Sequence, residues 1–316
     1  MTAASARGVE GELPTAGNEL STDSRLLGSF LAVTAADLIV RSAYQMGKSP
    51  LLPIFAASLG AGDLFLGLIV SVSTLTGMAL KPFIGVFSDR WGWRAWLVAG
   101  TLLFAIMPFL YRFVHTPEEL LAIRIAHGTA TAIYGPVTLA FVAAQTRPGK
   151  RAGKFGLFSL ARSGGYIIGP AAAGWLLMRV EPAQVFTIIG LLSSLALLPI
   201  LFLPKPQTTA VNRRPPLTPQ PTLRRQIKEA LHSGGRTPAV WVSGGLDAAV
   251  YVALYALKAF LPVYGITLGM SVTQIGLFFS VQEGATMILK PLGGRLGDRW
   301  GRLRVIALGM LLYGFM

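Results

Sequence analysis

Residues 80–94 decide the fold of this chain, and they read Leu-Lys-Pro-Phe-Ile-Gly-Val-Phe-Ser-Asp-Arg-Trp-Gly-Trp-Arg. Residues 289–302, which lie 209 positions further on, read Leu-Lys-Pro-Leu-Gly-Gly-Arg-Leu-Gly-Asp-Arg-Trp-Gly-Arg. Leucine, lysine, proline, glycine, aspartate, arginine, tryptophan and a second glycine recur in register. Chance does not give a match of this length, so the chain contains two copies of one structural unit.

The composition identifies a membrane protein. The 316 residues are 53% hydrophobic and 13% charged, with a mean hydropathy of +0.57, whereas soluble domains carry about a quarter charged residues. Apolar runs of about 20 residues recur, each long enough to cross the hydrocarbon core of a bilayer. These runs are continuous and do not alternate, so a β-barrel is excluded and the predicted class is an all-α polytopic membrane protein.

The net charge of +14 could indicate a nucleic-acid partner, but its placement argues against one. Basic residues concentrate in alternate loops, which is a signal of membrane topology. The absence of cysteine excludes disulfides and thiol chemistry. The first apolar run carries Asp37 and Arg41, so we expect it to remain as a helix and not to act as a signal peptide.

Hydrophobic patterning predicts a series of long helices, the first of them kinked near Pro50 and Pro53. The predicted helices cover residues 26–58, 64–87, 95–114, 119–144, 153–178, 184–203, 239–267 and 273–296, and a last one begins near 303. The predicted organisation is a cytoplasmic tail (1–25), a six-helix transmembrane half (26–203), a basic, Pro-rich cytoplasmic linker (204–238) and a partial second half (239–316).

The internal repeat extends well beyond the two quoted stretches. From Pro53 onward the offset of 209 also relates Gly60 to Gly269, Gly67 to Gly276 and Ser71 to Ser280. Upstream, with a slip of one residue, Asp37 and Lys48 correspond to Asp247 and Lys258. Because the loops after residues 144 and 203 and both quoted turns are the basic ones, we predict a cytoplasmic N-terminus and linker.

The spacing glycine, three residues, aspartate, arginine, one residue, glycine and a basic residue resembles the signature after the second and eighth helices of the major facilitator superfamily. Trp93 departs from it, standing where a basic residue is usual. The resemblance implies two pseudo-symmetric six-helix halves that rock about a midplane site. It assigns conformational gating to Gly85, Asp89, Arg90, Gly92, Arg94, Gly294, Asp298, Arg299, Gly301 and Arg302.

Symmetry places the end of the second half well beyond Met316. We therefore expect a C-terminally truncated chain with about nine helices, lacking the last ones of this fold.

Polar side chains follow one face of three predicted helices. Asp37, Arg41, Tyr44 and Lys48 are spaced by four, three and four residues, and similar stripes begin at Arg124 and Asp247. Charges within hydrocarbon are costly and usually face a cavity or a partner, so each could also form a structural ion pair between helices. Together the stripes predict a central substrate cavity lined by Arg41, Tyr44, Lys48, Thr131, Tyr134, Asp247, Tyr251 and Lys258.

Arg124, four residues before Gly128, resembles the helix-4 signature of proton-coupled members of the superfamily. In those proteins the arginine faces an acidic residue of the first helix, and here Asp37 is the candidate. A guanidinium beside a buried carboxylate stabilises its charged form, which would let the carboxylate load and release a proton. Glu283, whose repeat position is Thr74, is a further proton-coupling candidate, with a structural ion pair as the alternative.

The fifth predicted helix carries Gly156, Gly165, Gly169, Pro170 and Gly174, a spacing that resembles a pattern of antiporters in the superfamily. The glycines would allow close helix packing, with simple packing as the alternative explanation. Lys81, Lys290 and Arg162 are expected to extend toward the membrane surface.

The predicted function is secondary active, proton-coupled export of a small organic or drug-like molecule. Uptake of a small organic anion is one alternative, because basic residues outnumber acidic ones along the stripes. A membrane sensor on a transporter fold is the other. No nucleotide-binding loop, catalytic triad or metal-ligand spacing occurs, so we expect no enzyme activity, no cofactor and no metal. The expected partners are substrate, protons and lipids, with no nucleic acid, for a monomer in the plasma membrane.

Overall fold

The structure is a computed structural model that describes residues 16–144, 151–203, 225, 228–229, 232 and 235–315; the side chains of residues 16–25, 89–91, 151–152, 239 and 302 lie outside the description. The predicted linker therefore falls almost entirely outside the described residues. By length and composition, six helices in the described part of the chain can cross a membrane, in agreement with the all-α polytopic class.

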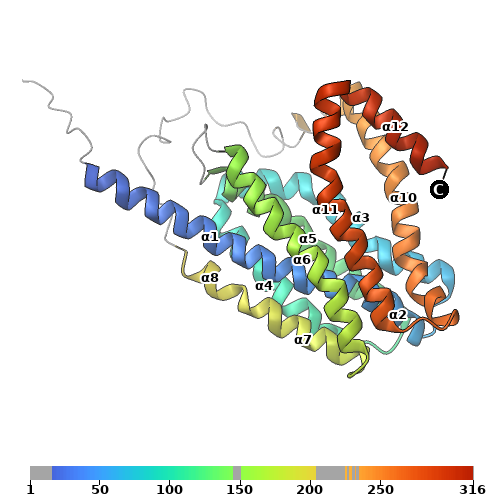
Figure 1. The fold of residues 1–316 in the computed structure, drawn as a ribbon. Helices are drawn as coiled ribbons and strands as arrows, with labels where there is room; N and C mark the ends of the chain where they lie inside the picture. The colour runs from blue at the N-terminus through green and yellow to red at the C-terminus, as the bar shows by residue number, and fades with distance from the viewer. Residues whose placement is uncertain are drawn as a thin grey trace, which may run out of the picture.

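The chain forms a bundle of long helices (Figure 1). The described elements are α1 (Ala16–Met46), a π-helical turn (Gly47–Leu51), α2 (Leu52–Ser58), α3 (Asp63–Trp91), α4 (Trp93–Leu110), a 3-10 turn (Tyr111–Phe113), α5 (Pro117–Ala144), α6 (Arg151–Leu177), α7 (Pro182–Leu195), α8 (Leu197–Leu201), α10 (Pro238–Thr267), α11 (Val272–Trp300) and α12 (Arg302–Gly314). The first helix begins at Ala16, earlier than the sequence predicted.

The predicted kink in the first helix is confirmed. Between α1 and α2 the backbone leaves the helical conformation at Ser49, where φ is −147° and ψ is 127°. Pro50 explains this locally, because its ring disfavours a helical conformation in the residue before it. Lys48 and Ser49 are both buried at this interruption, so the break holds a lysine inside the bundle.

The repeated turns have the same backbone in both halves. Gly92 ends α3 with φ at 86°, and Gly301 ends α11 with φ at 91°. Only glycine adopts such angles at little cost, which explains why both copies need it there. Gly60 and Gly269, also related by the repeat, have φ of 83° and 82°. The internal repeat read from the sequence is therefore a repeat of structure.

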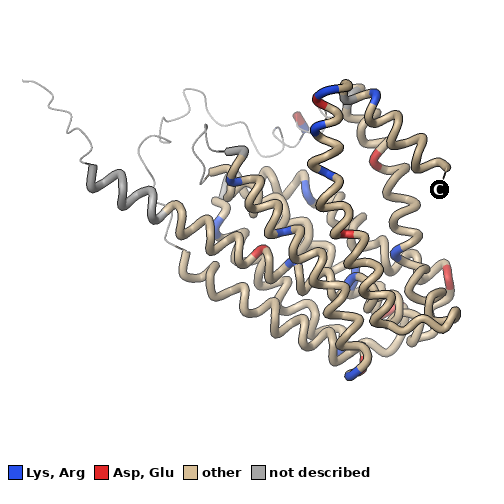
Figure 2. Tube along the Cα trace, viewed as in Figure 1, with Lys and Arg blue, Asp and Glu red and all other residues tan. Residues whose placement is uncertain are grey.

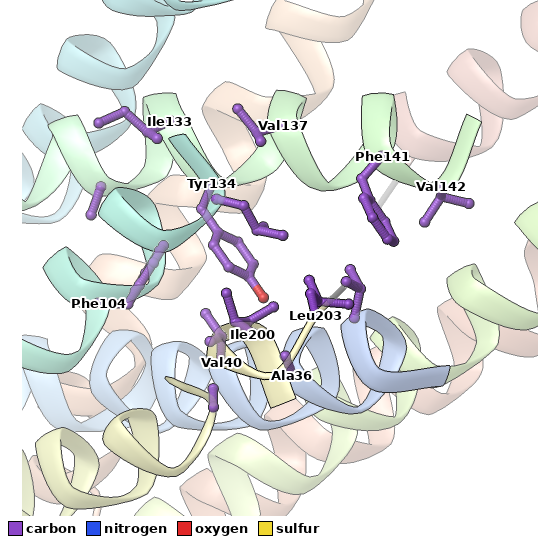
Figure 3. Packing of buried hydrophobic residues seen from close by; sticks show 14 of the residues in the cluster. Ala36, Val40, Phe104, Ile133, Tyr134, Val137, Phe141, Val142, Ile200 and Leu203 are labelled. Atoms are coloured by element: carbon purple, nitrogen blue, oxygen red, sulfur yellow. The ribbon is translucent and has the colours of Figure 1, made fainter. Parts of the chain in front are cut away.

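Aromatic and aliphatic side chains fill the interior of the first half (Figure 3). The ring of Phe104 on α4 meets that of Tyr134 on α5 edge-on, at 5.4 Å between centroids. Trp93 and Phe141 make a second edge-on contact at 4.5 Å, between the start of α4 and α5. Such pairs add to the burial of apolar area and fix the relative rotation of the helices that carry the polar residues.

The two halves join along α6 and α11, and along α3 and α10. On the first seam, Ser280 Oγ donates to the carbonyl oxygen of Ile167 at 2.6 Å. A Cβ added at Gly276 would lie 2.5 Å from the Pro170 carbonyl oxygen, so the two backbones touch. Figure 1 shows α11 lying along α6 at one end and leading away from it toward α12.

The signature turns lie at the end of the bundle where α11 leads away from α6. Among the described residues, nothing lies within 4 Å of a Cβ added at Gly85 or Gly294, so no other helix packs closely on either glycine. Arg94 donates to the Leu201 carbonyl oxygen at 3.4 Å, and Asp298 and Arg299 are exposed. The side chains of Asp89, Arg90 and Arg302 lie outside the described residues.

Candidate functional site

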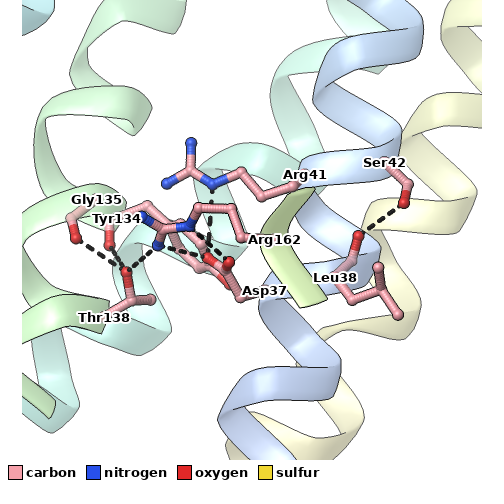
Figure 4. A network of polar contacts seen from close by, with 8 residues as sticks. All are labelled: Asp37, Leu38, Arg41, Ser42, Tyr134, Gly135, Thr138 and Arg162. Atoms are coloured by element: carbon pink, nitrogen blue, oxygen red, sulfur yellow. Dashed lines mark hydrogen bonds and ion pairs between the residues drawn. The ribbon is translucent and has the colours of Figure 1, made fainter. Parts of the chain in front are cut away.

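Charged residues occur in the middle of several helices as well as near helix ends (Figure 2). The most enclosed is Asp37 on α1, which is 1% exposed. Arg162 on α6 donates to both of its carboxylate oxygens, from Nε at 2.9 Å and Nη2 at 3.1 Å (Figure 4). The same Nη2 donates to Thr138 Oγ1 on α5 at 3.3 Å. The carboxylate therefore ties three helices together.

Arg41, one turn from Asp37 on α1, completes this network. Its Nε lies 3.5 Å from Asp37 Oδ1, and its guanidinium lies 5.6 Å from the centre of the Tyr134 ring. The Tyr134 hydroxyl is buried and has no hydrogen-bond partner in the described part of the chain. Asp37, predicted from the sequence as a proton-coupling residue, thus lies beside Arg41 and close to Tyr134, which were predicted to line the substrate cavity.

The predicted pairing of Asp37 with Arg124 is wrong in this structure. Arg124 is 2% exposed and points toward α3, where Nε donates to the Ile69 carbonyl oxygen at 3.2 Å and Nη2 donates to Ser73 Oγ. Nη1 lies 3.5 Å from the hydroxyl of Tyr111. Arg162 takes the expected place beside Asp37, so Arg162 does not extend to the membrane surface as predicted.

A second cluster forms where the halves meet. Lys48 Nζ donates to the hydroxyl of Tyr255 on α10 at 2.9 Å, and that hydroxyl lies 3.3 Å from Thr74 Oγ1 on α3. The ammonium lies 4.6 Å from the centre of the Tyr255 ring and 5.8 Å from that of Tyr44. The cluster therefore joins the interruption after α1, α3 and α10 across the junction.

The second half holds its own ion pair. Lys258 Nζ on α10 donates to Glu283 Oε1 on α11 at 2.9 Å. The exposed fractions of the two side chains are 11% and 19%. The pair lies one turn from Tyr255 along α10, so it borders the Lys48 cluster.

Of the remaining predicted cavity residues, Asp247 and Thr131 lie apart from these clusters, and Tyr251 borders the Lys48 cluster. Asp247 is exposed and lines a groove between α10 and α12, together with Tyr313 and Met310. Tyr251 is 49% exposed and its ring lies 5.9 Å from that of Tyr255. Thr131 Oγ1 donates to the Gly128 carbonyl oxygen at 2.8 Å and would meet a Cβ at Gly77, so it packs α5 against α3.

The glycines of α6 pack on two different helices. Added Cβ atoms at Gly165 and Gly169 would meet the backbone of α1 at 3.0 Å and 2.8 Å. One at Gly174 would lie 2.6 Å from the Val272 carbonyl oxygen on α11, and Gly156 has nothing within 4 Å. Helix α6 thus packs on α1, which carries Asp37, and also on α11 of the other half.

Sequence reasoning did not predict Arg162 as the partner of Asp37, Thr74 as a neighbour of Tyr255, or Ser73 as an acceptor for Arg124. For Arg162 the sequence did carry a signal, namely a charged residue within an apolar run, because such a charge is costly in a membrane unless it is paired. Serine and threonine in a membrane helix give no comparable signal. Across the described residues no group of three or more His, Cys, Asp or Glu side chains could hold a metal ion.

The chain has membrane-length helices in two related halves and buried polar clusters at and near their junction. This is the organisation of a polytopic membrane protein of the secondary-transporter class. The chain belongs to the Major Facilitator Superfamily, whose family model matches residues 31–316.

Relatives by sequence fit this assignment. The MFS-type transporter MJ1560 of Methanocaldococcus jannaschii is 25% identical over 84% of this chain and 68% of its own length. The MFS-type transporter YuxJ of Bacillus subtilis is 28% identical over 78% of this chain and 62% of its own length. The quinolone resistance protein NorA of Staphylococcus aureus is 28% identical over 51% of this chain and 42% of its own length. The chain thus spans between two fifths and about two thirds of these relatives.

Solved structures show the same fold. A bacterial homologue of the human lysosomal transporter Spinster, in an inward-facing and unoccupied conformation, aligns with a TM-score of 0.61 at 17% identity, over 89% of this chain and 63% of its own. A D-xylose–proton symporter aligns with a TM-score of 0.58 at 12% identity, over 86% of this chain and 69% of its own. At these identities the likeness concerns the fold alone.

Proposed function

We propose that this protein is a proton-coupled secondary transporter that exports a small organic molecule by alternating access, with Asp37 as the proton-carrying residue. The observation that carries the proposal is the enclosed carboxylate of Asp37, held by Arg162 and Arg41 where α1, α5 and α6 meet. A charge in this position is costly, and in membrane proteins such residues commonly mark proton relays.

The packing of α6 against both α1 and α11 can couple protonation of Asp37 to the relative movement of the two halves. Protonation of Asp37 removes the negative charge of the ion pair with Arg162, so the tie between α1 and α6 weakens. Helix α6 also touches α11 through Gly174 and Gly276. A shift of α6 relative to α1 would therefore reach the seam between the halves, which is the two-state element that alternating access requires.

Two observations support export. The α6 glycine spacing resembles that of antiporters, and the relative NorA is a quinolone resistance protein. The basic loops support a cytoplasmic N-terminus in the plasma membrane. We propose that the protein works as a monomer, because in the superfamily one chain supplies both halves that move in alternating access.

Flux in vesicles tests the proposal. Purified protein is reconstituted into vesicles containing a pH-sensitive dye, and norfloxacin, a quinolone, is added outside. Antiport predicts that the interior becomes more alkaline than in protein-free vesicles, because protons leave as the drug enters. Acidification would instead indicate symport and overturn export. No difference from protein-free vesicles would favour a sensor without transport.

A further inference from the structure

Buried charges in the described residues are unbalanced. Four buried side chains are lysine or arginine, namely Arg41, Lys48, Arg124 and Lys258, and Asp37 carries the buried carboxylate. Arg41 and Arg162 share Asp37, and Lys258 has Glu283. Within the described part of the chain, Lys48 and Arg124 have no carboxylate partner.

Lys48 is the more open of these two to a ligand. Its ammonium carries three N–H donors, and the hydroxyl of Tyr255 is the acceptor that the structure gives it. The side chain is 9% exposed, so water does not freely replace the missing acceptors. A buried ammonium with a neutral partner is unfavourable unless something supplies the opposite charge.

The internal repeat shows where that charge would sit. Lys48 and Lys258 are equivalent positions in the two halves, and Glu283, the partner of Lys258, is equivalent to Thr74. Thr74 is in place, since its hydroxyl lies 3.3 Å from the Tyr255 hydroxyl that Lys48 contacts. The first half therefore has a lysine equivalent to Lys258 and a helix, α3, equivalent to α11. At the position of Glu283, however, α3 carries the hydroxyl of Thr74 and no carboxylate.

We propose that the transported molecule carries an anionic group, a carboxylate or a phosphate, that binds Lys48 in the position equivalent to the Glu283 carboxylate. This inference rests on the proposed function in one respect: it takes the molecule that binds Lys48 to be the one that is transported. The rings of Tyr44 and Tyr255 lie close to the Lys48 ammonium and give the site apolar surfaces. The favoured ligand is therefore an aromatic or amphiphilic anion.

Arg124 adds a second positive charge near Tyr44, the residue that borders Lys48. Tyr44 lies within electrostatic range of Lys48 and Arg124, and also of Arg41, whose charge Asp37 balances. Arg124 lines a small cavity that Tyr44 and Gly47 also line, next to Lys48 in the chain. Two cations without a carboxylate partner in the described residues thus lie near one tyrosine, which favours an anion over a neutral or cationic ligand because the site has little water to screen them.

A charge series on the unmodified protein tests the inference without a variant. The probes are 2-naphthoate, 2-naphthamide and 2-naphthylmethylammonium, which share one ring system and differ in charge. Dissociation constants are measured for the purified protein in detergent. We expect naphthoate to bind at least about tenfold more tightly than the amide, and the ammonium to bind most weakly. Naphthoate binding no tighter than the amide would overturn the inference.

Variants on two helices locate the site. Lys48→Met should remove the preference for naphthoate over the amide, whereas Lys48→Arg should keep it. Thr74→Glu supplies a carboxylate from the chain itself and should weaken naphthoate binding by about tenfold more than Thr74→Gln does. Lys81→Met, on an exposed lysine of α3, is the control that should leave the preference unchanged. A naphthoate preference that survives in Lys48→Met would contradict the assignment.

Binding and transport can fail separately. If naphthoate is preferred but no substrate moves protons in vesicles, the anion site stands and the proposed transport falls. If vesicles show proton-coupled flux of norfloxacin while naphthoate, amide and ammonium bind alike, the transport stands and the anion site falls.

Discussion

Lys48 and Lys258 occupy equivalent positions in the two halves and contact different partners. Lys258 donates to the Glu283 carboxylate within its own half, whereas Lys48 reaches across the junction to the phenol of Tyr255. The repeat preserves the two lysines and the glycine turns, but the backbone leaves the helical conformation at Ser49 beside Lys48, whereas α10 continues past Lys258. The comparison teaches that the residue facing each lysine decides whether the lysine has a carboxylate partner among the described residues.

Neutralising Glu283 should have the largest effect on stability. Glu283→Gln leaves Lys258 largely buried without a carboxylate, and breaking such a pair costs about 3 kcal/mol or more of the free energy of unfolding. The measurement is the denaturation of the purified protein in detergent, followed by tryptophan fluorescence. Adding Lys258→Met to the same chain should restore most of the loss, and a variant as stable as the wild type would show that the pair is not formed.

The glycines of the repeat should respond differently to a methyl group. Gly276→Ala places a Cβ 2.5 Å from the Pro170 carbonyl oxygen, so we expect it to lower the free energy of unfolding by about 1–3 kcal/mol. Gly67 is its equivalent, and a Cβ there meets the tip of the Phe260 ring at an ordinary 3.9 Å. Gly67→Ala is thus the matched control. Equal effects in the two variants would mean that the α6–α11 seam is looser than the structure shows.

The paired serines extend the comparison to one hydrogen bond. Ser280 Oγ donates across the seam to Ile167, while Ser71 Oγ donates to Gly67 within its own helix. Ser280→Ala leaves a carbonyl oxygen at the seam without this donor, so it should cost about 1 kcal/mol of unfolding free energy. Ser71→Ala should cost less, because its hydrogen bond lies within one helix and does not join two helices. The same denaturation measurement compares them, and a larger loss for Ser71→Ala would reverse the expected order.

Removing Lys48 should change stability least. Lys48→Met takes away a buried ammonium that has no carboxylate partner among the described residues, so the free energy of unfolding should stay the same or rise. Lys258→Met alone, which strands Glu283, should lower it instead. A clear loss of stability in Lys48→Met would indicate that the contact with Tyr255 is structural.

The sequence predicted the fold from features that are local. Apolar runs, the Asp-Arg-Trp-Gly turns and Pro50 determine helix lengths, turn geometry and the kink through the backbone itself. The partner of Asp37 was not predictable in this way. Arg124 and Arg162 both lie inside apolar helices, and which one faces α1 depends on how α5 and α6 rotate. Contacts such as Phe104 with Tyr134, which join distant residues, set that rotation.

Proton coupling through Asp37 is the central claim, and proton movement in vesicles tests it most directly. Vesicles are prepared with equal amounts of folded wild type, Asp37→Asn or Asp63→Asn. Asp63 is an exposed aspartate at the start of α3, so Asp63→Asn serves as the control. We predict that norfloxacin moves protons in the wild type and in Asp63→Asn, and that Asp37→Asn still takes up the drug without proton movement. Proton movement at the wild-type rate in Asp37→Asn would contradict the account and direct attention to Glu283.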